Sequence, residues 1–190
     1  MVIDLFGLDE AEVRQQFADV WQHLRNHVFD QRASLKDRTP DSLQYARQWW
    51  LHGKPRPELR KALFGLPRYI ATVETAKHRP FCFLPASVIP DNKLLCIATS
   101  DAFYLGVLSS RFHTKWALAA GGHLGVGNDP VYVKTRCFDP FPFPAASAAL
   151  RAEIAATAEE LDALRRTRLD GNPQLTMTGL YNVLEKLRAA

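Results

Sequence analysis

Three patterns in this chain of 190 residues predict an α+β fold, a small β-containing core flanked by N-terminal and C-terminal helices. Apolar residues recur at helical spacing near the start of the chain and again after residue 144. Between these regions, short β-prone runs alternate with Pro, Asn and Gly. We therefore predict a helical lead-in and linker over residues 1–66, a central domain over 67–144 and a C-terminal helical segment over 145–190.

The lead-in is predicted to begin with one long amphipathic helix. Asp9 and Glu12 have the spacing of a capping box, and apolar residues then follow every three or four positions until about Phe29. The polar stretch over residues 31–40 is a predicted loop. A short helix is expected over residues 41–51, and a further helical turn or two before residue 65.

The central domain is predicted to combine short strands with two helices. The β-prone runs cover residues 69–73, 81–84, 94–99 and 131–138. Asp101 has the position of a helix N-cap, and a second helix is expected over residues 111–120, where two glycines follow. After the central domain, two more helices are predicted on either side of a Gly-Asn-Pro break at 171–173.

Positive charge is concentrated in the middle of the chain. The net formal charge is +4 and the pI is near 9.1. Residues 1–30 carry a net −4, residues 31–136 carry +9 and residues 137–190 carry −1. A basic middle between acidic flanks favours a polyanionic partner such as double-stranded DNA, because Lys and Arg side chains bind phosphates.

Several other classes of protein are disfavoured. No window approaches the roughly 18 apolar residues that span a bilayer, and the N-terminus lacks the basic start of a signal peptide, so we expect a cytoplasmic chain without membrane contact. Cys82, Cys96 and Cys137 lie in apolar segments without metal-ligand spacing, which predicts buried, reduced thiols. His23 and His27 lack a third ligand nearby and are expected to form a surface pair.

The segment over residues 111–144 joins a basic aromatic helix, a glycine-rich loop, a basic strand and a Pro- and Phe-rich exit. This order resembles the target-recognition domain of MmeI-like restriction-modification methyltransferases. There, a Ser-Ser-x-x-His-x-x-Trp helix precedes a Gly-Gly/Arg-x-Leu loop and a strand ending in Phe-Pro-x-Pro. The helix signature falls here on Ser109, Ser110, His113 and Trp116. Residues 49–60 and 66–72 also resemble the lead-in to this domain, so the resemblance covers nearly the whole chain.

The resemblance implies sequence-specific reading of double-stranded DNA on behalf of an adenine-N6 methyltransferase that is often fused to a nuclease. The chain has no Phe-x-Gly-x-Gly cofactor loop, and no nuclease-like Pro-Asp followed by Glu-x-Lys. Only one proline directly follows Asp139, unlike the Asn/Asp-Pro-Pro-aromatic motif of amino-methyltransferases. We therefore expect a non-catalytic fragment without a cofactor of its own, whose parent chain supplies the methyltransferase domain and binds S-adenosylmethionine.

In this family the loop corresponding to residues 121–129 supplies base-reading side chains. A dinucleotide-binding loop is disfavoured here, because this loop follows a predicted helix and precedes a predicted strand. Family members often carry charged residues where this chain has Gly125 and Gly127. The polar candidates for base contact are therefore His123, Asn128 and Asp129, with a plain flexible turn as the alternative.

Lys134 and Arg136 are the next candidates. Alternation in the predicted strand 131–138 places both cations on one face, where they are expected to contact phosphate or guanine rather than remain solvated edge charges. In the preceding helix, Arg111 and Lys115 lie side by side at positions i and i+4 and are also predicted DNA contacts. Two aromatic residues of that helix are expected in the core: Phe112 and Trp116.

Two strand connections complete the predicted interface. Lys77, His78 and Arg79 form a cationic turn that would clamp phosphate in a DNA-binding protein and be merely solvated in most others. Asn92 and Lys93 lie at the tip of another connection and are weaker candidates. Two alternative functions stay open: a free-standing specificity subunit that recruits a separate catalytic chain, and a protein-interaction module whose exposed aromatics bind a partner.

Overall fold

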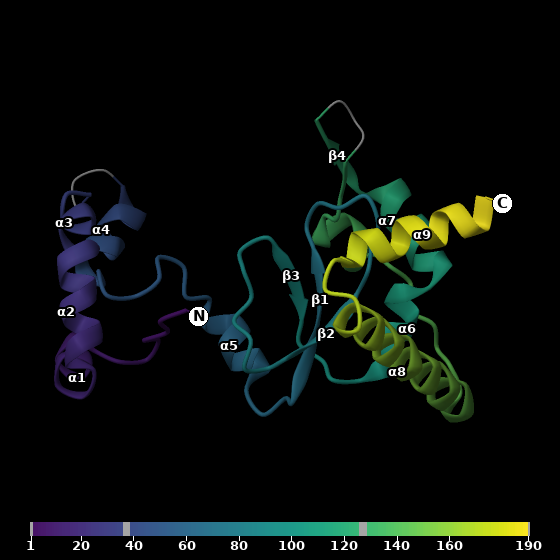
Figure 1. Ribbon diagram of the computed structural model, residues 1–190, viewed down its shortest axis with the longest axis horizontal. Helices are drawn as coiled ribbons and strands as arrows, with labels where there is room; N and C mark the ends of the chain where they lie inside the picture. Colours follow the sequence, from purple (N-terminus) through teal and green to yellow (C-terminus); the bar gives the residue numbers. More distant parts are fainter. Residues whose placement is uncertain (1, 36–38, 126–128, 190) are drawn as a thin grey trace. The chain divides into compact units, whose positions relative to one another are not determined.

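The computed structural model describes residues 2–35, 39–125 and 129–189. It confirms the predicted α+β class, with helices at both ends and small antiparallel sheets between them (Figure 1). The chain divides into two compact units, Met1–Glu58 and Leu59–Ala190, and each is described by itself.

The first unit is helical. Its helices are α1 (Glu10–Gln16), α2 (Ala18–His27), α3 (Phe29–Ala33) and α4 (Pro40–Arg47). The predicted capping box is present, since the Asp9 and Glu12 amides each donate to the other residue's carboxylate at 2.8 Å. Trp49 is buried and packs edge-on against the rings of Trp21 and Phe29, which joins three segments of this unit.

The single long helix predicted for this region is wrong. The backbone leaves helical geometry at Phe17 and again at Val28, so that α1 and α2 replace the one helix and α3 follows separately. At each break the amide still donates to the carbonyl four residues earlier, which keeps the chain compact across the kink. Neither Gly nor Pro marks either position. α3 also occupies the start of the stretch predicted as a loop.

The second unit contains a three-stranded sheet of order β2-β1-β3. α5 (Pro57–Leu63) leads into it, and its strands are β1 (Arg68–Val73), β2 (Cys82–Pro85) and β3 (Leu94–Ile97). In register, Ile70 of the central strand lies between Phe83 and Ile97. The predicted strands before residue 100 are thus confirmed, and all pair antiparallel.

The remaining elements follow the sheet. They are α6 (Ala102–Ser109), α7 (Arg111–Ala120), the hairpin β4 (Gly122–Leu124) and β5 (Asp129–Val131), a π-helical turn (Lys134–Phe138), α8 (Ala148–Asp170) and α9 (Met177–Ala189). The predicted N-cap of α6 is present, with Asp101 Oδ1 accepting from the Phe103 amide at 2.8 Å. The predicted break between the last two helices is also confirmed.

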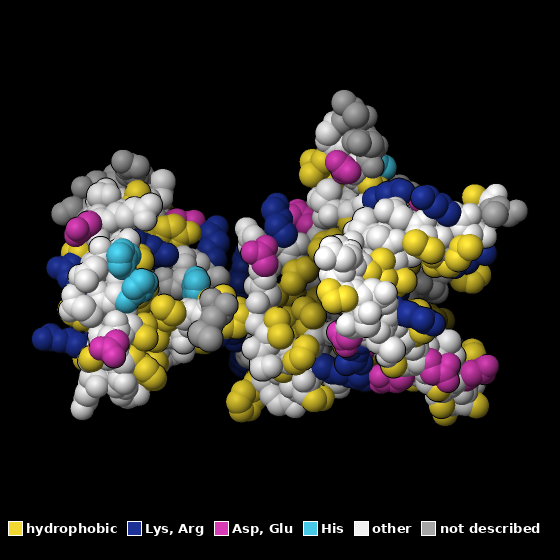
Figure 2. All heavy atoms as spheres, in the orientation of Figure 1, with side chains coloured by type: hydrophobic (Ala, Val, Ile, Leu, Met, Phe, Trp, Pro, Cys, Tyr) yellow, Lys and Arg dark blue, Asp and Glu magenta, His cyan; other side chains and the backbone are white. Residues whose placement is uncertain are grey.

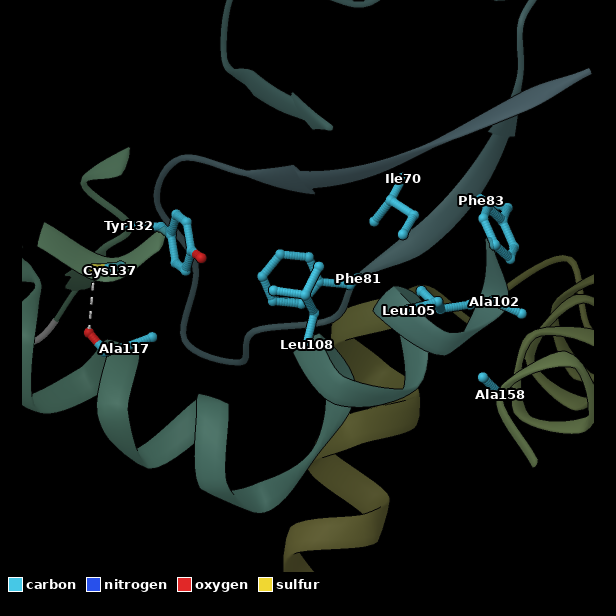
Figure 3. Close-up of a cluster of buried hydrophobic side chains, with 10 residues drawn as sticks. All are labelled: Ile70, Phe81, Phe83, Ala102, Leu105, Leu108, Ala117, Tyr132, Cys137 and Ala158. Carbon is cyan, nitrogen blue, oxygen red and sulfur yellow. Dashed lines mark hydrogen bonds between the residues drawn. The ribbon is translucent and has the colours of Figure 1, made fainter. Parts of the chain in front are cut away.

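The main core lies between the sheet, α6, α7 and α8 (Figure 3). Its buried members are Ile70, Phe81, Phe83, Ala102, Leu105, Leu108, Ala117, Tyr132, Cys137 and Ala158. α8 approaches α6 closely at Gly106, where an added Cβ would lie 2.6 Å from Ile154 Cγ2. The carboxylate of Glu159 on α8 also accepts two hydrogen bonds from the Arg68 guanidinium, which lowers the pKa of Glu159 and ties α8 to β1.

The predicted strand over residues 131–138 is a further error. The sheet pairing ends at Val131, and the chain turns into the π-helix, where the Asp139 amide donates to the Lys134 carbonyl at 3.0 Å. The reason is burial: Tyr132 and Cys137 both enter the core, yet residues five apart point to opposite faces of a strand. Lys134 and Arg136 therefore lie on a helical turn and do not share a strand face.

The core prediction for Phe112 is also wrong, since 86% of its surface is exposed. The helix instead buries His113 and Ala117, and Trp116 is half-buried. Of the three cysteines predicted to be buried, only Cys137 is; Cys82 and Cys96 are half-buried. All three are free thiols, and partial burial raises the pKa of Cys96 to about 11.

The Ser-Ser-x-x-His-x-x-Trp signature fastens α7 in place. Ser110 caps the helix, with its Oγ accepting from the His113 amide at 3.2 Å. The His113 ring is buried among aromatic side chains, and its Nε2 lies 2.9 Å from the Tyr132 hydroxyl. Trp116 Nε1 donates to the Cys137 carbonyl at 3.1 Å. This signature therefore positions the helix and the π-helical turn against each other.

None of the helices within the described residues combines the length and hydropathy that a membrane span requires.

The burial of His113 predicts an acid-sensitive fold. Burial lowers the pKa of His113 to about 4, whereas the unfolded chain protonates near 6.5. Below pH 6.5 the unfolded state binds the proton more readily, so stability is lost as pH falls toward 4. We expect the free energy of unfolding, measured by urea titration, to fall by about 2 kcal/mol between pH 7 and pH 5.

The matched control is His113→Gln, which should be less stable at pH 7 but should show a flatter profile over the same range. The pKa values of Glu159 and Glu185 are lowered as well. These two carboxylates change the stability only below their ordinary pKa of 4.5, outside the range from pH 7 to pH 5. An unchanged pH profile in the variant would assign the acid sensitivity to another group.

Candidate DNA interface

The glycine-rich segment forms a short hairpin rather than the predicted loop. β4 pairs with β5 from Gly122 opposite Val131 to Leu124 opposite Asp129, and the hairpin projects from the second unit (Figure 1). The side chains of His123, Leu124 and Asp129 are exposed on it, and Figure 2 shows histidine, hydrophobic and acidic side chains together there. Asn128, the third base-reading candidate, lies outside the described residues.

The base of this hairpin is fastened to the segment that leaves β1. Thr75 bridges to Val131, the Tyr132 amide donates to the Glu74 carbonyl at 2.8 Å, and the Ala76 amide donates to the Pro130 carbonyl at 3.2 Å. Two three-residue strands are marginal by themselves, so these contacts hold the hairpin on the unit. We call Glu74–Pro80 the junction segment.

Arg79, predicted to clamp phosphate, lies inside the junction segment and is only 8% exposed. Its guanidinium donates to three backbone carbonyls, those of Val73, Glu74 and Pro130, the last at 3.0 Å. Burial lowers the pKa of Arg79, and the three acceptors offset that desolvation cost. The guanidinium is thus used within the fold, where it joins the hairpin to the end of β1.

Lys77 and His78 also have partners within the chain, and both partners are on α9. Lys77 Nζ lies 2.7 Å from the Glu185 carboxylate and 3.0 Å from Asn182 Oδ1. His78 Nε2 lies 2.9 Å from the same Asn182 oxygen. The hydrogen bond from Lys77 lowers the pKa of Glu185. The predicted phosphate clamp is therefore engaged by the C-terminal helix.

Asn92 and Lys93 lie at the turn before β3, and both are exposed. Lys93 Nζ pairs with the Glu74 carboxylate at 3.1 Å, and the Glu74 amide donates to the Lys93 carbonyl at 2.8 Å. Glu74 also accepts from Tyr132, so it connects this turn to the base of the hairpin. The turn and the hairpin, distant in sequence, are thereby brought together at the junction segment.

The remaining predicted cations lie on α7 and the π-helical turn, which pack against each other through the Trp116 and Cys137 hydrogen bonds. Lys134 Nζ pairs with both Asp139 carboxylate oxygens, at 2.6 and 2.7 Å. The other three cations of these two elements, Arg111, Lys115 and Arg136, are exposed, and none makes an ion pair with another described residue. They are available to a polyanion.

Beside this basic surface lies an apolar groove of about 510 Å³, lined chiefly by α6, α7 and the exit after the π-helical turn. Phe112, Trp116 and Phe141 supply its aromatic walls, and the Ser110 hydroxyl is among its few polar groups. This lining does not fit a charged nucleoside cofactor such as S-adenosylmethionine.

Within residues 2–35, 39–125 and 129–189, no three His, Cys, Asp or Glu side chains are arranged to hold a metal ion. His23 and His27 are exposed, with ring centroids 4.6 Å apart.

Two groups that matter for the site escaped prediction from sequence. Glu74 and Tyr132 organise the base of the hairpin, but a lone Glu at a strand end and a Tyr among apolar residues carry no such signal. The structure brings the candidates at 77–79, 92–93 and 129 together around the junction segment. The cations of α7 and the π-helical turn form a separate group.

The family described as "MmeI, target recognition domain" matches residues 9–145 of this sequence. The chain belongs to the MmeI target recognition domain family. A similar fold occurs in the solved structure of the Type IIL restriction-modification enzyme MmeI in complex with DNA, with a TM-score of 0.62 and 21% sequence identity. That similarity covers 94% of this chain and 22% of the enzyme, so the chain spans about a fifth of its length. Comparison with curated proteins found no match.

The close packing at the start of the hairpin generates a prediction for this target recognition domain. A Cβ added at Gly121 would lie 2.5 Å from the Val131 carbonyl oxygen and 2.7 Å from that of Ala117, both backbone atoms. Gly121→Ala should therefore destabilise the second unit by about 1–3 kcal/mol in urea unfolding. Gly122→Ala is the control, because its nearest neighbour would be 3.9 Å away. Equal effects of the two substitutions would contradict this packing.

Proposed function

We propose that this chain reads a specific sequence in double-stranded DNA through the β4–β5 hairpin. The observation that carries the proposal is a projecting hairpin with exposed polar and apolar side chains, fastened at its base by buried contacts. Such a ribbon fits the major groove, where base edges present a distinct pattern of donors and acceptors. Membership in the target recognition family supports the same function.

The proposed interface separates two kinds of contact. His123, Asn128 and Asp129 are proposed to contact base edges, while Arg111, Lys115, Lys134 and Arg136 bind phosphates or, in the case of an arginine, guanine. Asn92 and Lys93 extend the interface beside the base of the hairpin. The surface pair of Lys134 with Asp139 is weak enough, at about 0–1 kcal/mol, for phosphate to replace it.

We further propose that the chain serves an adenine-N6 methyltransferase of a type II restriction-modification system, in the cytoplasm. The similar enzyme is named a restriction-modification enzyme and is bound to DNA in its solved structure. In the parent protein the methyltransferase domain would bind S-adenosylmethionine and extrude the target adenine. Residues 1–66 would link the two domains, 67–144 would read DNA and 145–190 would begin a C-terminal helical domain.

The phosphate contacts predict a salt dependence. The double variant Lys134→Ala/Arg136→Ala should bind duplex DNA more weakly, and the log-log slope of affinity against salt should flatten by about one unit per lost phosphate contact. The measurement is a fluorescence-anisotropy titration at several salt concentrations. Lys61→Ala/Arg168→Ala is the control, because it removes two exposed cations from α5 and α8. Unchanged binding at low salt would place Lys134 and Arg136 outside the interface.

The base contacts predict a change of specificity. Asp129→Ala removes a carboxylate that can accept from cytosine, and discrimination at one base position should fall by about 1–3 kcal/mol. Selection from a randomised duplex library followed by sequencing measures this preference. Asp170→Ala removes an exposed carboxylate of α8 and should leave the preference intact. An unaltered consensus for Asp129→Ala would exclude this side chain from base reading.

A second function is favoured by one observation. Phe112 is almost fully exposed at the rim of the apolar groove, as expected of a surface that binds another protein. A protein-interaction module would lack the salt-dependent duplex binding described above. A free-standing specificity subunit would combine both properties, with a separate catalytic chain seated on this groove.

A further inference from the structure

The C-terminal helix α9 contacts the same junction segment that holds the hairpin. Asn182 and Glu185 bind Lys77 and His78 at 2.7–3.0 Å, and the His78 ring lies 5.7 Å from that of Tyr181. A second link holds α9, because Arg165 of α8 donates both to the Tyr181 hydroxyl on α9 and to the Phe81 carbonyl before β2. α9 is thereby anchored to the middle of the β1–β2 connection and, through Arg165, to its end at Phe81.

The junction segment transmits this anchoring to the hairpin over a few residues. Directly after Lys77 and His78, the Arg79 guanidinium holds the Pro130 carbonyl in β5 at 3.0 Å. The Ala76 amide donates to the same carbonyl, and Thr75 bridges to Val131. A displacement of the segment at residues 77–78 therefore moves the backbone that positions Asp129.

We infer that α9 is a part of the DNA-reading apparatus that sets the position of the β4–β5 hairpin, with Lys77, His78, Asn182 and Glu185 as positioning residues. This inference rests on the proposed function. It assigns Lys77 and His78 a role different from the phosphate contact predicted from sequence. It also makes base discrimination depend on a helix that begins 46 residues after the hairpin ends.

Positioning matters because the hydrogen bonds that read bases tolerate only a small displacement of the hairpin, whereas the attraction of cations to phosphate tolerates a larger one. Base edges are read by hydrogen bonds of defined length and direction. Phosphate contacts are long-ranged and independent of sequence. Loosening the hairpin should therefore reduce the affinity for the preferred sequence while sparing the affinity for random duplex.

The test is the double variant Asn182→Ala/Glu185→Ala, which removes all the polar contacts between α9 and residues 77–78. The preferred sequence is first selected with the wild-type chain from a randomised duplex library. We expect the ratio of affinities for preferred and random duplex to fall about tenfold, with random-duplex affinity within twofold and an unchanged salt slope. Glu160→Ala is the control for charge, since Glu160 is exposed on α8 and makes no ion pair among the described residues.

Two further variants separate positioning from direct contact. Lys77→Ala should lose discrimination as the double variant does, and combining all three substitutions should add little, because they interrupt one network. Three outcomes would overturn the inference: a uniform loss of affinity with a flatter salt slope in Lys77→Ala, tighter binding of all duplexes by the double variant, or no change. The first would make Lys77 a phosphate contact, and the second would make α9 a competitor of DNA.

Hydrogen exchange provides a measurement without DNA. The amides of Ala76 and Tyr132 close the base of the hairpin and should exchange about tenfold faster in the double variant, while amides of β1 stay protected. Unchanged exchange would overturn the coupling. Faster exchange together with no duplex binding by the wild-type chain would keep the coupling and instead overturn the proposed function.

Discussion

The buried Arg79 guanidinium is the contact on which the presentation of the hairpin depends. A two-stranded hairpin with three residues in each strand is not stable by itself in water. Arg79 joins the Pro130 carbonyl to the carbonyls at the end of β1, beneath the ring of Tyr132. Because its planar fork can satisfy several carbonyls at once, arginine suits this place better than lysine does.

The signature that resembles the target-recognition domain supports the fold rather than the reading of bases. Its Ser, His and Trp side chains cap α7, fill the core and fasten the π-helical turn. The side chains proposed to meet DNA are other residues, on the hairpin, the turn before β3, the exposed face of α7 and the π-helical turn. Scaffold and reading surface are therefore different residues, which is how rigid folds commonly present variable binding loops.

Positive charge in this chain serves two purposes that net charge alone does not distinguish. Arg68, Arg79 and Arg165 are turned inward to carboxylates and carbonyls, where they hold the sheet, the junction segment and α8 together. Arg111, Lys115 and Arg136 are exposed, and within the described residues they make no ion pair. Removing an inward-turned arginine would leave buried acceptors unsatisfied, which costs stability, whereas an exposed cation is free to meet phosphate.

Local sequence determined much of this protein. Side-chain caps, apolar periodicity and β-prone runs predicted α6, α7, the strands β1, β2 and β3 and both C-terminal helices, and the ordered motifs predicted the family. These features depend on neighbours in the sequence. Tertiary packing decided the rest: Tyr132 and Cys137 bury together and turn a predicted strand into a π-helix, and His113 enters the core in place of Phe112. Arg79 and Lys77 resembled solvated cations because their partners, Pro130 and Glu185, are far away in the sequence. Such contacts become visible only when the chain is folded.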